Sequence, residues 1–197
     1  MNSNINFENE VTVEVDISLD ELISILNNNN FKLKQEYDVN DIYMIRNDID
    51  LNMNVLELFK KCVLIRNIIT DKKNMKLITY KYKEYDNDGN ITRNGKVNCE
   101  ISSLDDAKSL LNMLDYNVLL TINDHIMVYA NDDDEFAIQI VNGKHVYIEI
   151  EQDCGFINKK YNDVNEMINS FNRYNIPIKN NDYFVKKAIN EFKELHS

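Results

Sequence analysis

Proline, glycine and cysteine are scarce in this chain, whose 197 residues include one proline, four glycines and three cysteines. No stretch rich in glycine, proline or serine divides the sequence and no internal repeat is present, so we expect one domain spanning 1–197. The cysteines are odd in number, widely spaced and without the spacing of metal ligands. This favours reduced core thiols in a cytoplasmic protein over disulfides or a zinc site.

Basic residues are also few, 22 against 33 acidic ones, which gives a net charge of −11. Surfaces that coat nucleic acids are normally basic, so a nucleic-acid polymer is not an expected partner. A small anionic ligand, held by a few bases and a metal ion, is compatible with this charge. No apolar run approaches the ~20 residues of a membrane span, and the N-terminus lacks signal-peptide character. The sequence therefore predicts a cytoplasmic protein without a membrane partner, and it leaves the oligomeric state open.

Acidic side chains recur at every second position in two segments, 7–16 and 145–151. Successive side chains of a strand point to opposite faces, so these acids share one face while valines and isoleucines occupy the other. Rows of carboxylates repel one another unless water, cations or bases lie between them. The pattern therefore indicates a polar groove or barrel interior that holds cations. A solvated edge strand is the alternative for 7–16, and a solvated face is an equal alternative for 145–151.

Apolar residues with helical spacing predict four helices. Ser18 and Glu21 form a capping box before the first of them. The expected core-facing stripes are Leu19, Leu22, Ile23 and Leu26; Leu104, Ala107, Leu110, Leu111 and Leu114; Val164, Met167, Ile168 and Phe171; and, from near Asp182, Phe184, Ala188, Phe192 and Leu195.

The remaining segments read as about eight strands, mostly joined as hairpins. The strands are expected at 7–16, 31–46 with an interruption near 38–40, 61–69, 76–85, 91–101, 118–130, 136–141 and 145–151. Residues 86–90 and 142–143 carry hairpin-turn signals, and 132–135 reads as a solvated turn. The predicted fold class is α+β, an antiparallel eight-stranded sheet with packing helices. A sheet of this size with one polar face tends to close into a barrel or tunnel.

Short motifs follow one another in a fixed order along this pattern. They are Glu8-x-Glu10, Asp41-x-Tyr43, Arg66 at the end of Val-Leu-Ile-Arg, Thr79-Tyr80-Lys81, Lys96-x-Asn98-x-Glu100 and Glu149-x-Glu151. From about Glu8 to Leu195 the chain resembles the CYTH superfamily, the triphosphate tunnel metalloenzymes, which include class IV adenylate cyclases and thiamine triphosphatases. Several positions depart from the family pattern: Thr12 stands for lysine, Leu64 for arginine, Asn98 for glutamate, Asn123 and His125 for a basic pair, and Gln139 for aspartate.

The resemblance implies a CYTH-like β tunnel that binds the triphosphate of a small molecule. A triphosphate carries about four negative charges and needs arginine and lysine to bind its oxygens. The expected substrate-binding residues are Arg66, Lys81, Lys83 and Lys96. The expected ligands of Mg²⁺ or Mn²⁺ are Glu8, Glu10, Glu100, Glu149 and Glu151, with Glu149, Glu151 and Lys81 as catalytic residues.

These residues predict a divalent-metal-dependent enzyme that hydrolyses a triphosphate or cyclises ATP. The missing basic residues favour an alternative, a catalytically impaired binding module for a nucleotide or phosphorylated ligand. A scaffold that binds a basic partner is the third possibility. Arg66 is either a phosphate ligand or half of a structural ion pair, and Lys81 and Lys83 are alternatively charges that guard a strand against aggregation.

Overall fold

The structure, a computed structural model, describes residues 7–85 and 91–196, with side chains for 9–85 and 94–196. Its contacts divide these residues into two compact units. Unit 1 contains residues 38–123 and 187–196 as far as they are described, and unit 2 contains residues 8–37 and 124–186. Strands β3 (Lys32–Arg46) and β7 (Tyr116–Ala130) run through both units. A single domain for the whole chain stays a prediction, and the predicted turn at 86–90 lies outside the described residues.

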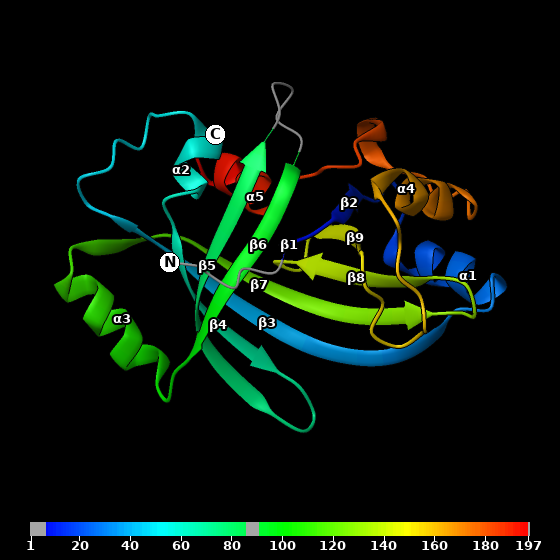
Figure 1. Ribbon diagram of the computed structural model, residues 1–197, viewed down its shortest axis with the longest axis horizontal. Helices are drawn as coiled ribbons and strands as arrows, with labels where there is room; N and C mark the ends of the chain where they lie inside the picture. Colours follow the sequence, from blue (N-terminus) through cyan, green and yellow to red (C-terminus); the bar gives the residue numbers. More distant parts are fainter. Residues whose placement is uncertain (1–6, 86–90, 197) are drawn as a thin grey trace. The chain divides into compact units, whose positions relative to one another are not determined.

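Unit 1 is an antiparallel sheet with the strand order β6-β5-β4-β3-β7 (Figure 1). Its other strands are β4 (Val63–Ile69), β5 (Asn74–Tyr85) and β6 (Ile91–Glu100), and the two-residue β1 (Phe7–Glu8) precedes them in the chain. Helix α3 (Leu104–Met113) covers one face, where Ala107 and Leu111 pack with Met44 and Ile65. The sheet face that α3 covers is therefore apolar, and the polar side chains lie on the opposite face.

Two further helices, α2 (Val55–Phe59) and α5 (Lys187–Leu195), pack together in unit 1. Phe59 of α2 lies 5.5 Å from Tyr43 and 5.8 Å from Phe192 between ring centroids. Tyr43 alternates with the apolar residues that face α3, so these contacts lie on the polar side of the sheet. Helix α2 has only five residues, too few to give a helical period in the sequence.

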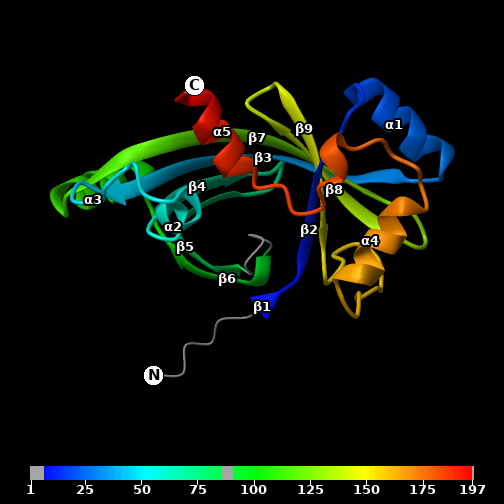
Figure 2. The same cartoon turned by 90° about the horizontal axis from the view of Figure 1, so that it is seen from above.

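Unit 2 is an antiparallel sheet with the order β3-β7-β8-β9-β2. Its strands include β2 (Glu10–Glu14), β8 (Glu135–Val141) and β9 (His145–Glu151). Helices α1 (Leu19–Asn28) and α4 (Val164–Asn172) cover the same sheet face, where their buried residues share one core with the valines of β2 (Figure 2). The alternating apolar residues predicted for β2 and β9 are therefore in the core, as expected.

The predicted helix starts are largely confirmed. Ser18 and Glu21 form the predicted capping box, with Ser18 Oγ accepting from Glu21 N and Glu21 Oε2 accepting from Ser18 N. Ser103 and Asp163 cap α3 and α4. In α3, however, Leu110 and Leu114 are 54% and 57% exposed, so their assignment to the core was wrong. Fewer leucines of α3 face the core than the helical spacing in the sequence suggests.

The start of the last helix was also predicted wrongly. The helix begins at Lys187, after a short 3₁₀ turn η1 (Lys179–Asn181) and an extended segment. In that segment Thr12 N donates to Tyr183 O, Val185 N donates to Thr12 O, and Asp16 N donates to Pro177 O. Backbone pairing with the outer edge of β2 thus overrides the local helical pattern near Asp182.

Three smaller expectations also need correction. Strand β3 continues through 38–40 without the predicted interruption. The turn at 132–135 is not fully solvated, because Asp134 is completely buried. Cys99 is exposed rather than a core thiol, although all three cysteines are free as expected. The predicted turn at Asn142-Gly143 is confirmed, with φ of 50° and 69°, and among the described residues no helix has the length and hydrophobicity to cross a bilayer.

Candidate functional site

The polar face of unit 2 brings acids from the first and last long strands together. Glu10 pairs with Glu151, Thr12 with Glu149 and Glu14 with Tyr147 across β2 and β9. Strand β8 continues two of these rows, with Ala137 beside Glu149 and Gln139 beside Tyr147. We call this surface the acidic face; its members are Glu10, Thr12, Glu14, Ala137, Gln139, Tyr147, Glu149 and Glu151.

Three of the predicted metal ligands, Glu10, Glu149 and Glu151, therefore lie on neighbouring strands of one face. Glu149 and Glu10 are half-buried and Glu151 is exposed. Thr12 is 5% exposed and Tyr147 is fully buried, so the centre of the acidic face is not an open solvated surface. The side chain of Glu8 lies outside the described residues.

Glu14, at one end of the acidic face, contacts one ammonium group and one imidazole. Lys179 Nζ donates to Glu14 Oε1 over 2.6 Å, and His145 Nδ1 lies 3.1 Å from the same oxygen. The Glu14 side chain is only 14% exposed. A carboxylate this buried is stable because basic groups surround it, so Glu14 contributes little net negative charge to the face.

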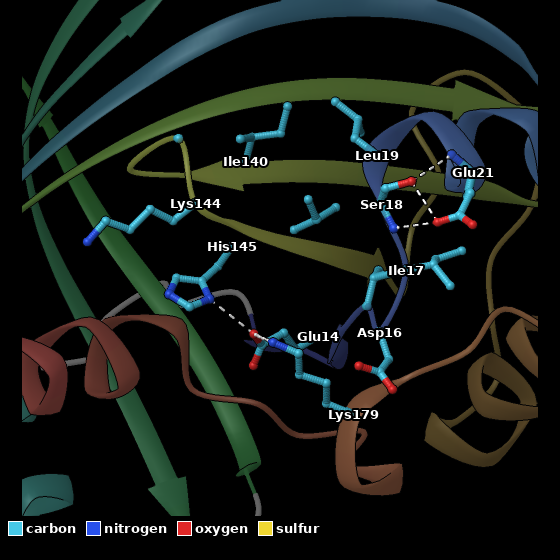
Figure 3. Close-up of a pocket in the computed structure, with 13 residues that line it drawn as sticks. Glu14, Asp16, Ile17, Ser18, Leu19, Glu21, Ile140, Lys144, His145 and Lys179 are labelled. Carbon is cyan, nitrogen blue, oxygen red and sulfur yellow. Dashed lines mark hydrogen bonds and ion pairs between the residues drawn. The ribbon is translucent and has the colours of Figure 1, made fainter.

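A cavity of about 640 Å³ opens beside Glu14, where β2 ends and α1 begins (Figure 3). Ile140 and Val146 from the core side of the sheet and Leu19 of α1 supply apolar walls, while Glu14 and His145 supply polar ones. Lys179 and His145 both contact Oε1 of Glu14 (Figure 3). The cavity thus combines aliphatic walls with polar and charged side chains.

The donor set of the acidic face fits a hard divalent cation. Mg²⁺ and Mn²⁺ prefer oxygen ligands, and the carboxylates of Glu10, Glu149 and Glu151 belong to neighbouring positions of this face. Gln139, only 4% exposed, adds an amide oxygen, Oε1, that has no hydrogen-bond partner among the described residues. An orphaned buried oxygen beside carboxylates is what a cation-binding position requires.

Unit 1 carries basic residues on the sheet face opposite α3. Lys81 pairs directly with Lys96, Lys83 with Asn94 and Thr79 with Asn98 across β5 and β6. Thr79 Oγ1 donates to Asn98 Oδ1 over 2.9 Å. We call this surface the basic face; its members are Asp41, Arg66, Thr79, Lys81, Lys83, Asn94, Lys96 and Asn98. The predicted phosphate ligands Arg66, Lys81, Lys83 and Lys96 are therefore brought to one face.

Arg66 makes a two-pronged contact with Asp41. Arg66 Nε donates to Asp41 Oδ1 over 2.7 Å and Nη2 donates to Oδ2 over 2.6 Å, with the Asp41 side chain 9% exposed. Burial opposes ionisation of Asp41, but the hydrogen bonds and charge of Arg66, with Lys81 and Lys187, lower the pKa of its carboxyl. The ion-pair alternative for Arg66 is thus present, and its role in ligand binding stays a prediction.

Glu100 is a predicted metal ligand that lies in unit 1. Its register position opposite Leu77 puts it on the sheet face of Lys96 and Asn98, it is exposed, and its Oε1 lies 3.9 Å from Lys73 Nζ, so its role as a metal ligand stays a prediction. Sequence reasoning did not assign Glu14, Asp41 or Gln139 to the site. Glu14 continues the alternation of Glu10 on one strand face, and Asp41 belongs to the Asp41-x-Tyr43 motif. Both residues could therefore have been considered from the sequence. For Gln139 the sequence offers one signal, its place ahead of the Asn-Gly turn.

Comparison with known proteins identifies the fold. No protein-family model matches the sequence, and no curated protein matches it. A protein from Pyrococcus horikoshii aligns with a TM-score of 0.66 and 18% identity over 96% of this chain and 100% of its own. A proposed adenylate cyclase from Vibrio parahaemolyticus aligns with a TM-score of 0.55 and 16% identity, over 93% and 97%. A proposed adenylyl cyclase from Hippeastrum with dominant triphosphatase activity gives 0.59 and 13%, over 95% of each chain.

These similarities confirm the predicted fold class, α+β with an antiparallel sheet and packing helices. At 13–18% identity they bear on the fold, and the chemistry has to be argued from the residues of this chain.

Proposed function

We propose that the protein binds a triphosphate together with Mg²⁺ or Mn²⁺ and hydrolyses it. One observation carries this proposal: like charges are placed directly opposite each other in both units, Lys81 beside Lys96 and Glu10 beside Glu151. Such pairs destabilise a sheet. They are tolerated where a ligand of the opposite charge binds, which would be an anion at the basic face and a cation at the acidic face.

The two faces are suited to groups of opposite charge. The ammonium groups of the basic face would bind phosphate oxygens, and the carboxylates of the acidic face would hold the cation. The bound cation would polarise a phosphoryl oxygen and neutralise developing charge. The contribution of the chain itself would be to position the phosphates and to compensate their charge, which accounts for most of the catalysis of phosphoryl transfer.

The cavity beside Glu14 favours an organic triphosphate over an inorganic one. Its volume of about 640 Å³ lies within the range of small-molecule sites, and aliphatic side chains such as Leu19 and Ile140 line it beside polar ones. We therefore expect the organic group of the ligand to occupy this cavity. Hydrolysis is preferred to cyclisation because no arrangement of side chains that reads a purine is evident in the described residues.

A binding module without turnover is the second candidate. Arg66 is already occupied by Asp41 through two nitrogens, and Thr12 and Gln139 contribute no charge. With fewer cationic groups the protein stabilises the transition state of triphosphate hydrolysis less, whereas a ligand of lower charge can still bind. This candidate predicts thermal stabilisation by a nucleotide without product release.

The proposed function is tested by incubating the protein with inorganic and organic triphosphates, with and without Mg²⁺ or Mn²⁺, and measuring phosphate and pyrophosphate. We expect metal-dependent release, fastest with an organic triphosphate. Glu149→Gln should lower the rate by at least about 100-fold, because it removes a carboxylate from the acidic face. Lys96→Gln should mainly raise KM.

Matched controls are Glu57→Gln and Lys61→Gln, which change the same residue types at positions that are members of neither face. Glu57 is exposed and contacts Lys60, and Lys61 is exposed. Equal losses in site and control variants would contradict the assignment. Ligand-induced stabilisation without turnover would favour the binding module, and the absence of both would leave a scaffold.

A further inference from the structure

Gln139 has an unusual environment for a polar side chain. It lies on β8 in the same row as Tyr147 and Glu14, and it is 4% exposed. Its Oε1 atom is buried and accepts no hydrogen bond from any described residue. More than nine in ten buried polar groups find a partner, and an orphaned acceptor lowers stability. Such an atom is either a packing defect or a group kept for a ligand.

The neighbours of Gln139 favour a ligand. Glu149 is its diagonal neighbour, because Gln139 pairs with Tyr147 while Glu149 pairs with Ala137. Diagonal neighbours are roughly 7–8 Å apart at Cα, within reach of two long side chains. Ala137, the smallest residue of the acidic face, is the direct cross-strand partner of Glu149. The amide oxygen and a carboxylate can therefore meet at one ion.

The charge of the acidic face sets how tightly an ion would be held. Glu14 forms an ion pair with Lys179, and Gln139 has no charge. Mg²⁺ keeps several waters and is usually held by one or two carboxylates together with phosphate oxygens of the substrate. A face with two uncharged or neutralised positions is suited to this shared arrangement rather than to a permanent metal site.

We propose that Gln139 Oε1 is a neutral oxygen ligand of the divalent cation, and that the cation is held tightly only when a phosphate ligand supplies further oxygens. This inference rests on the proposed function. Under this proposal the metal and the triphosphate each raise the affinity of the protein for the other. The protein without a phosphate ligand stays largely free of metal.

Isothermal titration calorimetry with three probes tests the proposal: Mn²⁺ alone, tripolyphosphate alone, and their preformed complex, with the imido analogue where tripolyphosphate is hydrolysed. For the wild-type protein we expect the complex to bind at least about tenfold more tightly than tripolyphosphate alone, with Mn²⁺ alone weaker still. Gln139→Glu, which adds a carboxylate at nearly constant shape, should raise the affinity for Mn²⁺ alone by about tenfold or more. Gln35→Glu adds the same charge at an exposed position of unit 2 and should change nothing.

Gln139→Leu separates a ligand from a packing defect. It removes the orphaned oxygen at similar volume, so the melting temperature should stay the same or rise, while the complex loses its roughly tenfold advantage over tripolyphosphate. A higher melting temperature with unchanged binding of the complex would overturn the proposal. So would a wild-type protein that binds Mn²⁺ equally well with and without phosphate.

The metal-free titration distinguishes this inference from the proposed function. Tripolyphosphate binding that Mn²⁺ does not strengthen would contradict the role of Gln139 and leave phosphate binding intact. Failure of all three probes to bind would contradict the proposed function, and the inference with it.

Discussion

The ion pair of Asp41 and Arg66 limits how many charges unit 1 can offer to an anion. Its two short hydrogen bonds are largely shielded from water, with side-chain exposures of 9% and 19%. Asp41→Asn would leave Arg66 without its counter-charge. We expect a loss of about 2–3 kcal/mol in the free energy of unfolding, measured with urea. Tripolyphosphate binding should become several-fold tighter, because the guanidinium and Lys81 then face the ligand unopposed.

The pair of Arg46 and Asp48 is a natural control, because it has the same two-pronged geometry at the surface. Both side chains are more than half exposed. Asp48→Asn should change stability by no more than about 0.5–1 kcal/mol and leave anion binding as it was. Weaker anion binding in Asp41→Asn would mean that Asp41 orients Arg66 for the ligand instead of competing with it.

Asp134 is a second buried charge, within unit 2. It accepts hydrogen bonds from Lys159, Ser170, Tyr161 and Tyr174 and joins the turn before β8 to α4. Burial would raise the pKa of its carboxyl, but these four donors outweigh it and lower the pKa to about 2. The network explains why one acid of the run 132–135 is in the core.

The low pKa makes unit 2 sensitive to acid. The folded protein holds Asp134 ionised down to pH about 2, whereas in the unfolded chain the carboxyl takes up a proton near its ordinary pKa of 3.8. The stabilisation, about 2 kcal/mol, is therefore complete above pH 4 and is lost as the pH falls towards 2. Urea unfolding at pH 2–6 should show this loss in the wild-type protein and a flatter profile in Asp134→Asn. Equal slopes for the two proteins would contradict it.

At the scale of elements, α3 shows how burial differs between adjacent leucines. Leu111 is 8% exposed and packs against the sheet, whereas Leu110 is 54% exposed. Leu111→Ala should lower the free energy of unfolding by about 2–3 kcal/mol, and Leu110→Ala by less than about 0.5 kcal/mol. Chemical unfolding of the two variants checks this, and comparable losses would show that Leu110 is covered in solution.

The elements that the sequence predicted well are those whose local signals agree with their packing. The capping box at Ser18, the stripe of α4 and the alternation of β9 all combine a local preference with a buried face. The start of α5 could not be predicted, because residues 183–185 gain backbone hydrogen bonds from β2 that no local pattern announces. Likewise, five residues of α2 are too few for a period.

The candidate site was also predicted only in part. Alternation placed Glu10, Glu149 and Glu151 on one face, and the register of β2 and β9 confirms it. The pairing of Asp41 with Arg66 depends on the register of β3 and β4, which a single sequence does not specify. The orphaned oxygen of Gln139 depends on what surrounds it, so only coordinates reveal it.

At the scale of the whole molecule, the net charge of −11 opposes the approach of an anion that the basic face would bind. Distant charges are screened first, because the Debye length falls from about 30 Å at 0.01 M salt to about 8 Å at 0.15 M. The association rate of tripolyphosphate, measured by stopped flow, should therefore rise several-fold over this range. A rate that falls throughout would mean that the local lysines dominate even at long range.

The segment 177–185 runs along the outer side of β2 and takes up hydrogen bonds from Thr12 and Asp16. A strand whose amides are exposed invites pairing with another molecule. A truncation that ends before Pro177 would remove this segment. The valine-rich strand β2 would then have backbone amides without hydrogen-bond partners. Such a shortened protein should accumulate as inclusion bodies, so deletions meant to isolate unit 2 have to keep residues up to 186.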